Sequence, residues 1–161
     1  MDKLIEWLPT AAPEQERVSV VHGDYRLDNM VFHPTEPRVI AVLDWELSTL
    51  GDPLADFTYQ LMGWVMPPEI RNGLLGVDIA ALGIPTIEQY TQAYCERTNR
   101  SGIPALDFYF AYNVFRLTSI IQGVYARSLQ GNASNSKASE MGAAVEPMAE
   151  AAWGFAKQAG A

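Results

Sequence analysis

Cysteine, lysine and long hydrophobic runs are scarce in this sequence, and each shortage argues against a class of protein. The single cysteine, Cys95, excludes an internal disulfide and a cysteine-based zinc cluster, and we expect it to be a buried helical residue. Three lysines and a net charge of −8 argue against a nucleic-acid partner, because phosphate backbones are bound through clustered Lys and Arg. No apolar stretch approaches the ~20 residues that cross a bilayer, so no membrane partner is expected.

Two further absences concern nucleotides and targeting. No two glycines stand one residue apart and no glycine precedes a lysine, so neither a G-x-G loop nor a Walker A motif is present. The first six residues, Met1 to Glu6, lack the apolar segment of a secretory signal. We therefore expect a cytoplasmic protein.

The length of 161 residues and an apolar content of 48% fit one globular domain with a substantial core. Residues 1–8 resemble the last turns of a helix closed by Pro9 and Pro13, and the polar residues up to 17 form a linker. β-branched runs predict a buried strand over 18–21 and two further strands over 30–33 and 38–43. The Pro-containing turn 34–37 joins the last two strands into a hairpin.

The rest of the chain is helical by pattern. Asp52 is placed as an N-cap, and Pro53 as the first residue of a helix that runs to 64. A loop follows over 65–85, and apolar periodicity predicts helices over 86–100, 106–129 and 136–158, the last one kinked or split at Pro147. The fold class is therefore α+β, mainly helical with a small β-hairpin layer.

Polar side chains follow two of the predicted strands. One stretch reads Val21-His22-Gly23-Asp24-Tyr25-Arg26-Leu27-Asp28-Asn29, and the other reads Val42-Leu43-Asp44-Trp45-Glu46. Taken singly, such Asp and Asn residues are common turn formers. Together, two carboxylates and one amide oxygen form an oxygen-rich pocket suited to Mg²⁺ and phosphate chemistry.

These two stretches resemble the catalytic and metal-binding loops of the aminoglycoside phosphotransferase/choline kinase-like (APH) family, relatives of protein kinases. The following Gly51-Asp52-Pro53-Leu54-Ala55-Asp56-Phe57 is similar to the pattern that opens the next helix of that family. The resemblance implies a protein-kinase-like C-terminal lobe in which Asp24 is the catalytic base and Asn29 and Asp44 bind Mg²⁺ and, through it, the nucleotide. The run from Asp44 to Asp56 is most similar to a phosphotransferase subgroup associated with acyl-CoA dehydrogenases.

Five further residues are assigned supporting roles. His22 is expected to hold the loop, as the histidine of the kinase H-R-D pattern does. The resemblance suggests that Asp56 braces the loop by accepting backbone N–H groups, and Asp52 remains a helix cap. Glu46 either approaches the metal through water or is simply solvated, and Arg26 either contacts phosphate or substrate or has no role there.

The N-terminal, nucleotide-binding lobe of such kinases has no counterpart in residues 1–161, and Lys3 lies in a helix-like segment rather than on the strand that would carry the phosphate-binding lysine. We expect a Mg²⁺-dependent kinase that transfers the γ-phosphate of ATP or GTP to a hydroxyl group, active in the full-length parent and weak or inactive as this piece. The helices after residue 64 would form the acceptor pocket, with Trp64, Tyr94, Tyr109, Tyr112 and Tyr125 as candidate lining, although most of these aromatic residues are expected to belong to the core.

Several questions stay open from the sequence. The acceptor is a hydroxyacyl compound, an amino sugar or a choline-like molecule. Two other classes remain, a metal-dependent hydrolase with His22, Asp24 and Asp44 as ligands, and a non-catalytic binding module. Self-association through the surface left by the missing lobe is a further expectation.

Overall fold

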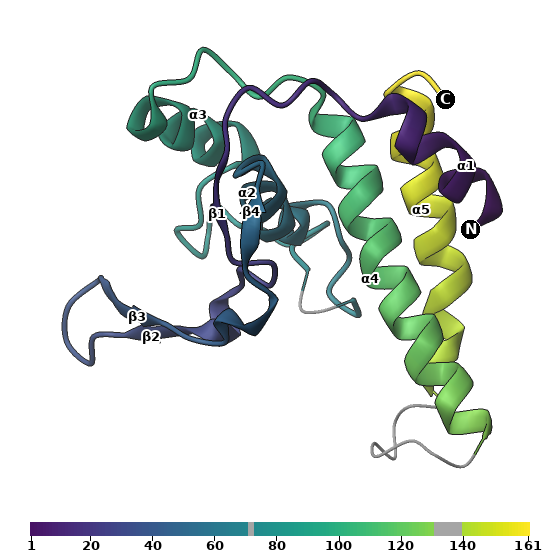
Figure 1. Cartoon of the computed structure of the whole chain (residues 1–161). Coiled ribbons are helices and arrows are strands. Elements are labelled where there is room, and N and C mark those ends of the chain that lie inside the picture. Colours follow the sequence, from purple (N-terminus) through teal and green to yellow (C-terminus); the bar gives the residue numbers. More distant parts are fainter. Residues whose placement is uncertain (71–72, 131–139) are drawn as a thin grey trace. The chain divides into compact units, whose positions relative to one another are not determined.

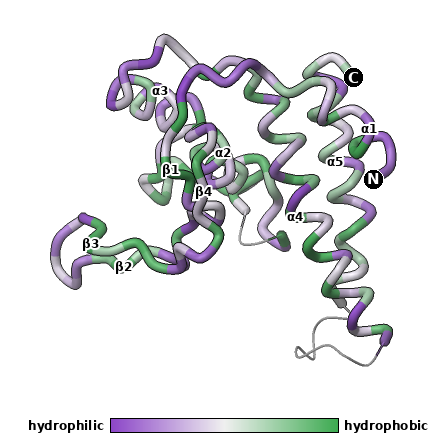
Figure 2. Tube along the Cα trace, viewed as in Figure 1, coloured by the Kyte–Doolittle hydropathy of each residue, from purple (hydrophilic) through white to green (hydrophobic). Residues whose placement is uncertain are grey.

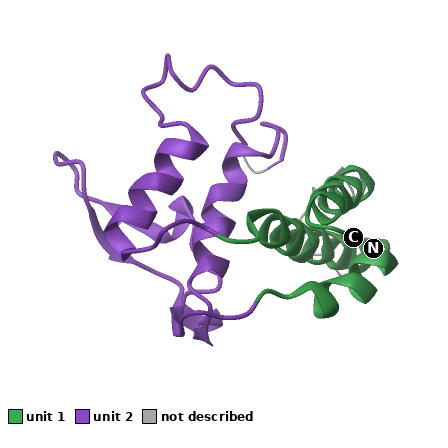
Figure 3. Cartoon of the chain, turned by 90° about the horizontal axis from the view of Figure 1, so that it is seen from above, with its two compact units in different colours: residues 1–13, 104–161 green, residues 14–103 purple. Residues whose placement is uncertain are grey.

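The computed structural model describes residues 1–70, 73–130 and 140–161. These residues form two compact units, one of residues 14–103 and one of residues 1–13 together with 104–161 (Figure 3). The assignment of residues 1–161 to one lobe stays a prediction. Among the described residues, no helix is long and apolar enough to cross a membrane.

Short strands in the unit of residues 14–103 form two antiparallel pairs (Figure 1). β1 (Ser19–Val21) pairs with β4 (Thr49–Gly51), and β2 (Met30–Phe32) pairs with β3 (Val39–Val42). The predicted hairpin is confirmed, with a bulge between Val31 and Phe32. β4 was not predicted, because three residues ending in glycine carry no strand pattern of their own.

The prediction that β1 is buried is wrong for most of its length. Val21 is buried, whereas Val20 is 63% exposed and lies opposite Leu50, which is 73% exposed. Successive side chains of a strand point to opposite faces, so Val20 and Leu50 lie on one face and leave it open, whereas on the other face Val21 is buried and Ser19 and Thr49 are exposed. Figure 2 shows hydrophobic stretches along the strand pairs, where Phe32 and Ile40 are also about half exposed.

Two helices complete this unit. α2 (Leu54–Leu61) continues as the 3₁₀ turn η3 (Met62–Trp64), which confirms the predicted helix over 53–64. α3 (Ile87–Thr98) begins with a capping box, in which Thr86 and Gln89 each accept a hydrogen bond from the other's backbone N–H. It ends at Asn99, which adopts the left-handed conformation with φ 52°, two residues before the expected stop at Ser101-Gly102. The buried apolar side chains include Leu54, Phe57, Leu61, Met62, Met66 and, as predicted, Cys95.

The second unit is helical. α4 (Leu106–Leu129) matches its predicted bounds and packs along α5 (Val145–Gln158), with the 3₁₀ turn η4 (Glu140–Ala144) before α5, and α1 (Asp2–Ala11) packs on both helices. The core side chains of this unit include Leu4, Leu8, Phe108, Phe110, Val114, Met148, Ala152 and Ala156. A cavity of about 380 Å³ between α1 and α4 is lined by Ile5, Leu8, Pro9, Ala12, Phe108, Tyr112 and Phe115.

Two predictions about prolines in this unit differ from the structure. α1 does not stop at Pro9 but continues through Ala11, because packing of its apolar face on α4 and α5 holds the helix despite the missing N–H. The described part of the last predicted helix is divided into η4 and α5, but the division falls before Val145 and Pro147 lies inside α5. It is the third residue of α5, a position whose N–H has no partner inside a helix. The predicted helical residues 136–139 lie outside the described residues.

Candidate active site

A sharp turn after β1 begins the loop that carries Asp24. Val21 and His22 are buried, and Gly23 follows with φ +85°, a conformation that other L residues rarely adopt. A Cβ atom at Gly23 would lie 2.6 Å from the backbone oxygen of Leu47. Glycine is therefore required here for both conformation and space, and it brings the loop directly against η2 (Trp45–Leu47).

The carboxylate of Asp56 holds the backbone of this turn. Its two oxygens accept hydrogen bonds from the N–H groups of His22, at 2.5 Å, and Gly23, at 2.9 Å. Asp56 lies in the first turn of α2, where the helix dipole also favours a negative charge. The bracing contact suggested for Asp56 by the resemblance is therefore present in the structure.

His22 links the two polar loops through both ring nitrogens. Its Nδ1 accepts a hydrogen bond from the Asp24 N–H at 3.2 Å, so Nε2 carries the hydrogen and donates to the Leu43 carbonyl at 2.7 Å. The ring also lies against Trp45, with 4.7 Å between ring centroids. Because both nitrogens are engaged by the backbone, His22 is placed to hold the loops and not to bind a metal.

The side chain of Asp24 is fixed at both of its oxygens. Asn29, at the end of η1 (Leu27–Asn29), donates from Nδ2 to Oδ2 of Asp24 at 3.0 Å and to its backbone oxygen at 2.9 Å. The hydroxyl of Tyr59 on α2 donates to Oδ1 at 2.9 Å. Tyr59 was not recognised in the sequence; its position three residues after Asp56, on the same face of a helix, is the signal that could have found it.

Asp44 lies in the second polar stretch, between the end of β3 and the start of η2. It is exposed and adopts the left-handed conformation, with φ 66° and ψ 50°, which Asp tolerates better than most residues. The Leu43 N–H donates to the Asn29 carbonyl at 2.8 Å, so the residue before Asp44 is bonded directly to the residue that orients Asp24. The structure thus joins Asp24 and Asn29 side chain to side chain, and joins Asp44 to them through the backbone.

The remaining predicted residues lie around this centre. Arg26 forms an ion pair with Asp28. Glu46 lies exposed in η2. Oδ1 of Asp52 accepts a hydrogen bond from the Leu54 N–H at 2.9 Å, the capping contact expected at the start of α2.

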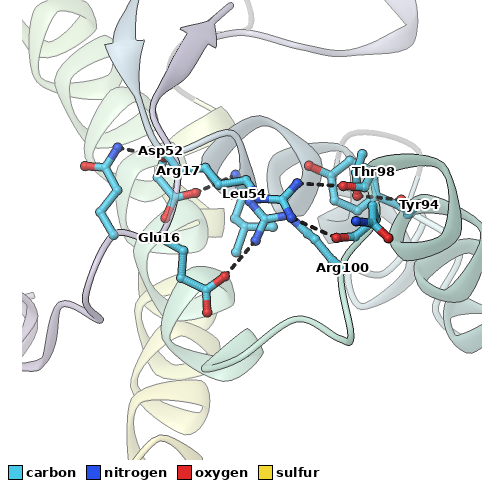
Figure 4. A network of polar contacts seen from close by, with 9 residues as sticks. Glu16, Arg17, Asp52, Leu54, Tyr94, Thr98 and Arg100 are labelled. Atoms are coloured by element: carbon cyan, nitrogen blue, oxygen red, sulfur yellow. Dashed lines mark hydrogen bonds and ion pairs between the residues drawn. The ribbon is translucent and has the colours of Figure 1, made fainter.

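A polar network that the sequence did not reveal anchors the linker before β1 (Figure 4). The guanidinium of Arg17 donates to the carbonyl oxygens of Thr98, at 2.6 Å, and Asn99, at 2.8 Å, and so caps the C-terminal end of α3. Arg100, whose side chain is 2% exposed, pairs with Glu16 at 3.3 Å. The segment that leads into the turn before Asp24 is therefore tied to α3 and the residues just after it.

Aromatic side chains connect α2 and α3. The ring of Phe57 stacks on that of Tyr94, with 3.8 Å between ring centroids. The ring centroids of Trp64 and Tyr90 are 4.9 Å apart. Burial raises the pKa of the Tyr90 and Tyr94 phenols above the ordinary value, and the nearby Tyr25 adds to the rise for Tyr90. Trp64 and Tyr94 thus belong to the unit of Asp24, whereas Tyr112 lies on α4 in the other unit.

The donor set is made of oxygen atoms. Because the amide nitrogen of Asn29 faces Asp24, its carbonyl oxygen points away from that carboxylate, and Asp44 presents an exposed carboxylate. Two such oxygens suit Mg²⁺, which keeps water and phosphate as its other ligands. Within the described residues, no group of three or more His, Cys, Asp or Glu side chains is placed to hold a metal ion. The hydrolase alternative, which needs three such ligands, finds no support in this geometry.

The chain resembles known proteins in both sequence and structure. The family described as "Phosphotransferase enzyme family" (APH) matches residues 1–109. A solved structure of a putative aminoglycoside phosphotransferase from Ralstonia eutropha JMP134 is 48% identical, with a TM-score of 0.89 over 98% of this chain and 48% of that chain. The kinase-like α+β fold predicted from the sequence is confirmed by this neighbour.

Two relatives carry acyl-CoA dehydrogenase names. Mouse acyl-CoA dehydrogenase family member 10 is 49% identical over 99% of this chain and 15% of its own length. Human acyl-CoA dehydrogenase family member 11 is 41% identical over 93% of this chain and 20% of its own length. The predicted similarity to the subgroup associated with acyl-CoA dehydrogenases is confirmed, and the chain spans at most one fifth of these two relatives.

Proposed function

Because the chain belongs to the phosphotransferase enzyme family, we propose that it is the catalytic and acceptor-binding part of a Mg²⁺-dependent kinase that acts on a hydroxyl group of a small molecule. The phosphoryl donor is ATP or GTP. The observation that carries the proposal is the carboxylate of Asp24, held between Asn29 and Tyr59 at the end of a backbone turn clamped by Asp56.

Asp24 accepts the proton of the acceptor hydroxyl. A carboxylate oxygen accepts two hydrogen bonds, and each oxygen of Asp24 receives one from the protein, so each can still receive an acceptor hydroxyl. A general base must lie at a set position relative to the reacting oxygen. Phosphoryl transfer depends mainly on positioning and charge stabilisation, which suits a loop held by so many hydrogen bonds.

Asn29 and Asp44 fit a magnesium ion. Their oxygens would bind Mg²⁺, which when bound neutralises charge on the nucleotide phosphates. In this chain the hydrogen bond from Asn29 to Asp24 ties the orientation of the amide to that of the base. The backbone bond from Leu43 to Asn29 ties the two loops, so base and metal ligands keep one mutual arrangement.

The nucleotide is held largely by a second lobe of the full-length protein. This chain covers 48% of the solved relative, and it contains neither a G-x-G loop nor a Walker A motif. Exposed apolar residues on the β1–β4 pair, Val20 and Leu50 among them, give such a lobe a surface to cover. The isolated chain therefore turns over slowly or not at all, and its open apolar face favours self-association.

For the acceptor we propose a hydroxyacyl compound. The support is that relatives matching over nearly the whole chain are named as acyl-CoA dehydrogenase family members. The net charge of −8 would equally suit a cationic amino sugar or choline, so these two are the competing acceptors. A panel of hydroxyacyl-CoA, choline and an aminoglycoside separates the three directly.

The test is phosphate transfer from labelled ATP and GTP by the full-length protein, with and without Mg²⁺. Asp24→Asn should lower kcat at least about a hundredfold, and Asn29→Ala and Asp44→Ala should raise the Mg²⁺ concentration needed for half-maximal rate. Asp28→Asn is the matched control, because Asp28 lies in the same loop but pairs with Arg26. Unchanged turnover in Asp24→Asn would overturn the assignment of the base.

A further inference from the structure

Tyr59 contributes a buried phenol whose hydroxyl donates to Oδ1 of Asp24 at 2.9 Å. Tyr59 is 6% exposed, and its hydrogen bond to Asp24 joins two residues that are 35 positions apart in the sequence. On the basis of the function proposed above, we propose that Tyr59 is a positioning residue that sets the orientation of the Asp24 carboxylate for the reaction.

Two residues of α2 hold the loop of Asp24, one through the loop backbone and the other through the Asp24 side chain. Asp56 and Tyr59 are three residues apart and so lie on one face of the helix. Asp56 clamps the backbone of the turn through the N–H groups of His22 and Gly23. Tyr59 clamps the side chain that the turn presents, so one rigid helix sets both the place and the direction of the base.

Tyr59 and Asn29 hold different oxygens of the same carboxylate. Asn29 lies on the loop itself and takes Oδ2, whereas Tyr59 takes Oδ1 from outside the loop. With both donors in place, rotation about the Cβ–Cγ bond of Asp24 breaks two hydrogen bonds. With Tyr59 removed, the carboxylate is held at one oxygen only and can turn away from an acceptor hydroxyl.

The experiment is Tyr59→Phe in the full-length protein, assayed with the best acceptor among hydroxyacyl-CoA, choline and an aminoglycoside. We expect kcat to fall about tenfold to a hundredfold, the loss typical of a hydrogen bond to a charged group, while KM for ATP and acceptor stays within about twofold. Thr58→Val is the matched control. Thr58 is also a buried hydroxyl of α2, but it donates to the Leu54 carbonyl, 2.6 Å away, so its loss should leave kcat within about twofold.

A double-mutant cycle with Asp24→Ala distinguishes positioning from general support of the fold. If Tyr59 acts through Asp24, Tyr59→Phe lowers the melting temperature of the wild type but causes no further loss in the Asp24→Ala background. Equal losses in both backgrounds, or an unchanged kcat in Tyr59→Phe, overturn the proposal. If no acceptor in the panel is phosphorylated, the stability cycle still tests the contact between Tyr59 and Asp24 on which the proposal rests, and equal losses in both backgrounds overturn it.

Failure of this inference and failure of the proposed function give different results. Full activity of Asp24→Ala removes the base and with it the proposed function. Loss of activity in Asp24→Ala with normal kcat in Tyr59→Phe removes only the role of Tyr59.

Discussion

Asp56→Ala should destabilise the unit of residues 14–103 and loosen the turn that carries Asp24. The change removes two hydrogen bonds, of 2.5 and 2.9 Å, from backbone N–H groups to a charged acceptor, and leaves both N–H groups without their partner. Each bond of this kind contributes ~1.5–3 kcal/mol, and the position in the first turn of α2 adds ~0.3–1 kcal/mol. Because the bonds share one part-buried carboxylate, we expect a net loss of about 2–4 kcal/mol in the free energy of unfolding.

Urea and thermal unfolding followed by circular dichroism measure this loss. For a chain of this size it corresponds to a fall in Tm of about 5–15 °C. Asp52→Ala is the comparison, because Asp52 also accepts a backbone N–H at the start of the same helix, and the loss of such a capping contact costs ~0.5–2 kcal/mol. Asp56→Asn should be nearly as harmful as Ala, since its NH₂ group faces an N–H donor. A loss below about 1 kcal/mol in Asp56→Ala would refute the view that this carboxylate holds the loop.

Three further predictions concern the same unit. Gly23→Ala should lower stability by about 1–3 kcal/mol in urea unfolding, because φ is +85° and the new Cβ meets the Leu47 oxygen at 2.6 Å; a neutral result would contradict the strained turn. Thr86→Ala should cost ~0.5–2 kcal/mol through the capping box, and Thr86→Ser should recover most of it. Burial raises the pKa of Tyr90 and Tyr94 above the ordinary phenol value of 10.0. The stability that the two neutral phenols contribute is therefore fully present below pH 10.0, and it is lost as the pH rises through their folded-state pKa values. Ultraviolet titration of tyrosinate checks this, and Tyr90→Phe with Tyr94→Phe should remove the alkaline loss.

Local pattern was sufficient for much of the fold. The apolar periodicity of 106–129 predicted α4 with its observed bounds, and the β-branched runs around a Pro-containing turn predicted the hairpin of β2 and β3. These elements depend on neighbours a few residues apart, and short-range spacing in a sequence records them. The prolines were less informative, because packing kept Pro9 inside α1 and the first-turn position made Pro147 harmless in α5.

For the site, the sequence by itself predicted which residues carry the proposed chemistry, since Asp24, Asn29 and Asp44 stand in a spacing that chance seldom produces. Only the tertiary structure decided what holds them. The hydrogen bonds that hold them join residues far apart in the sequence: Tyr59 and Asp24 are 35 positions apart, Asp56 and His22 are 34 apart, and Arg17 and Thr98 are 81 apart. The open face of β1 was also beyond local pattern. Such contacts arise from how distant segments pack, and a single sequence records the types of residue at each end but not that they meet.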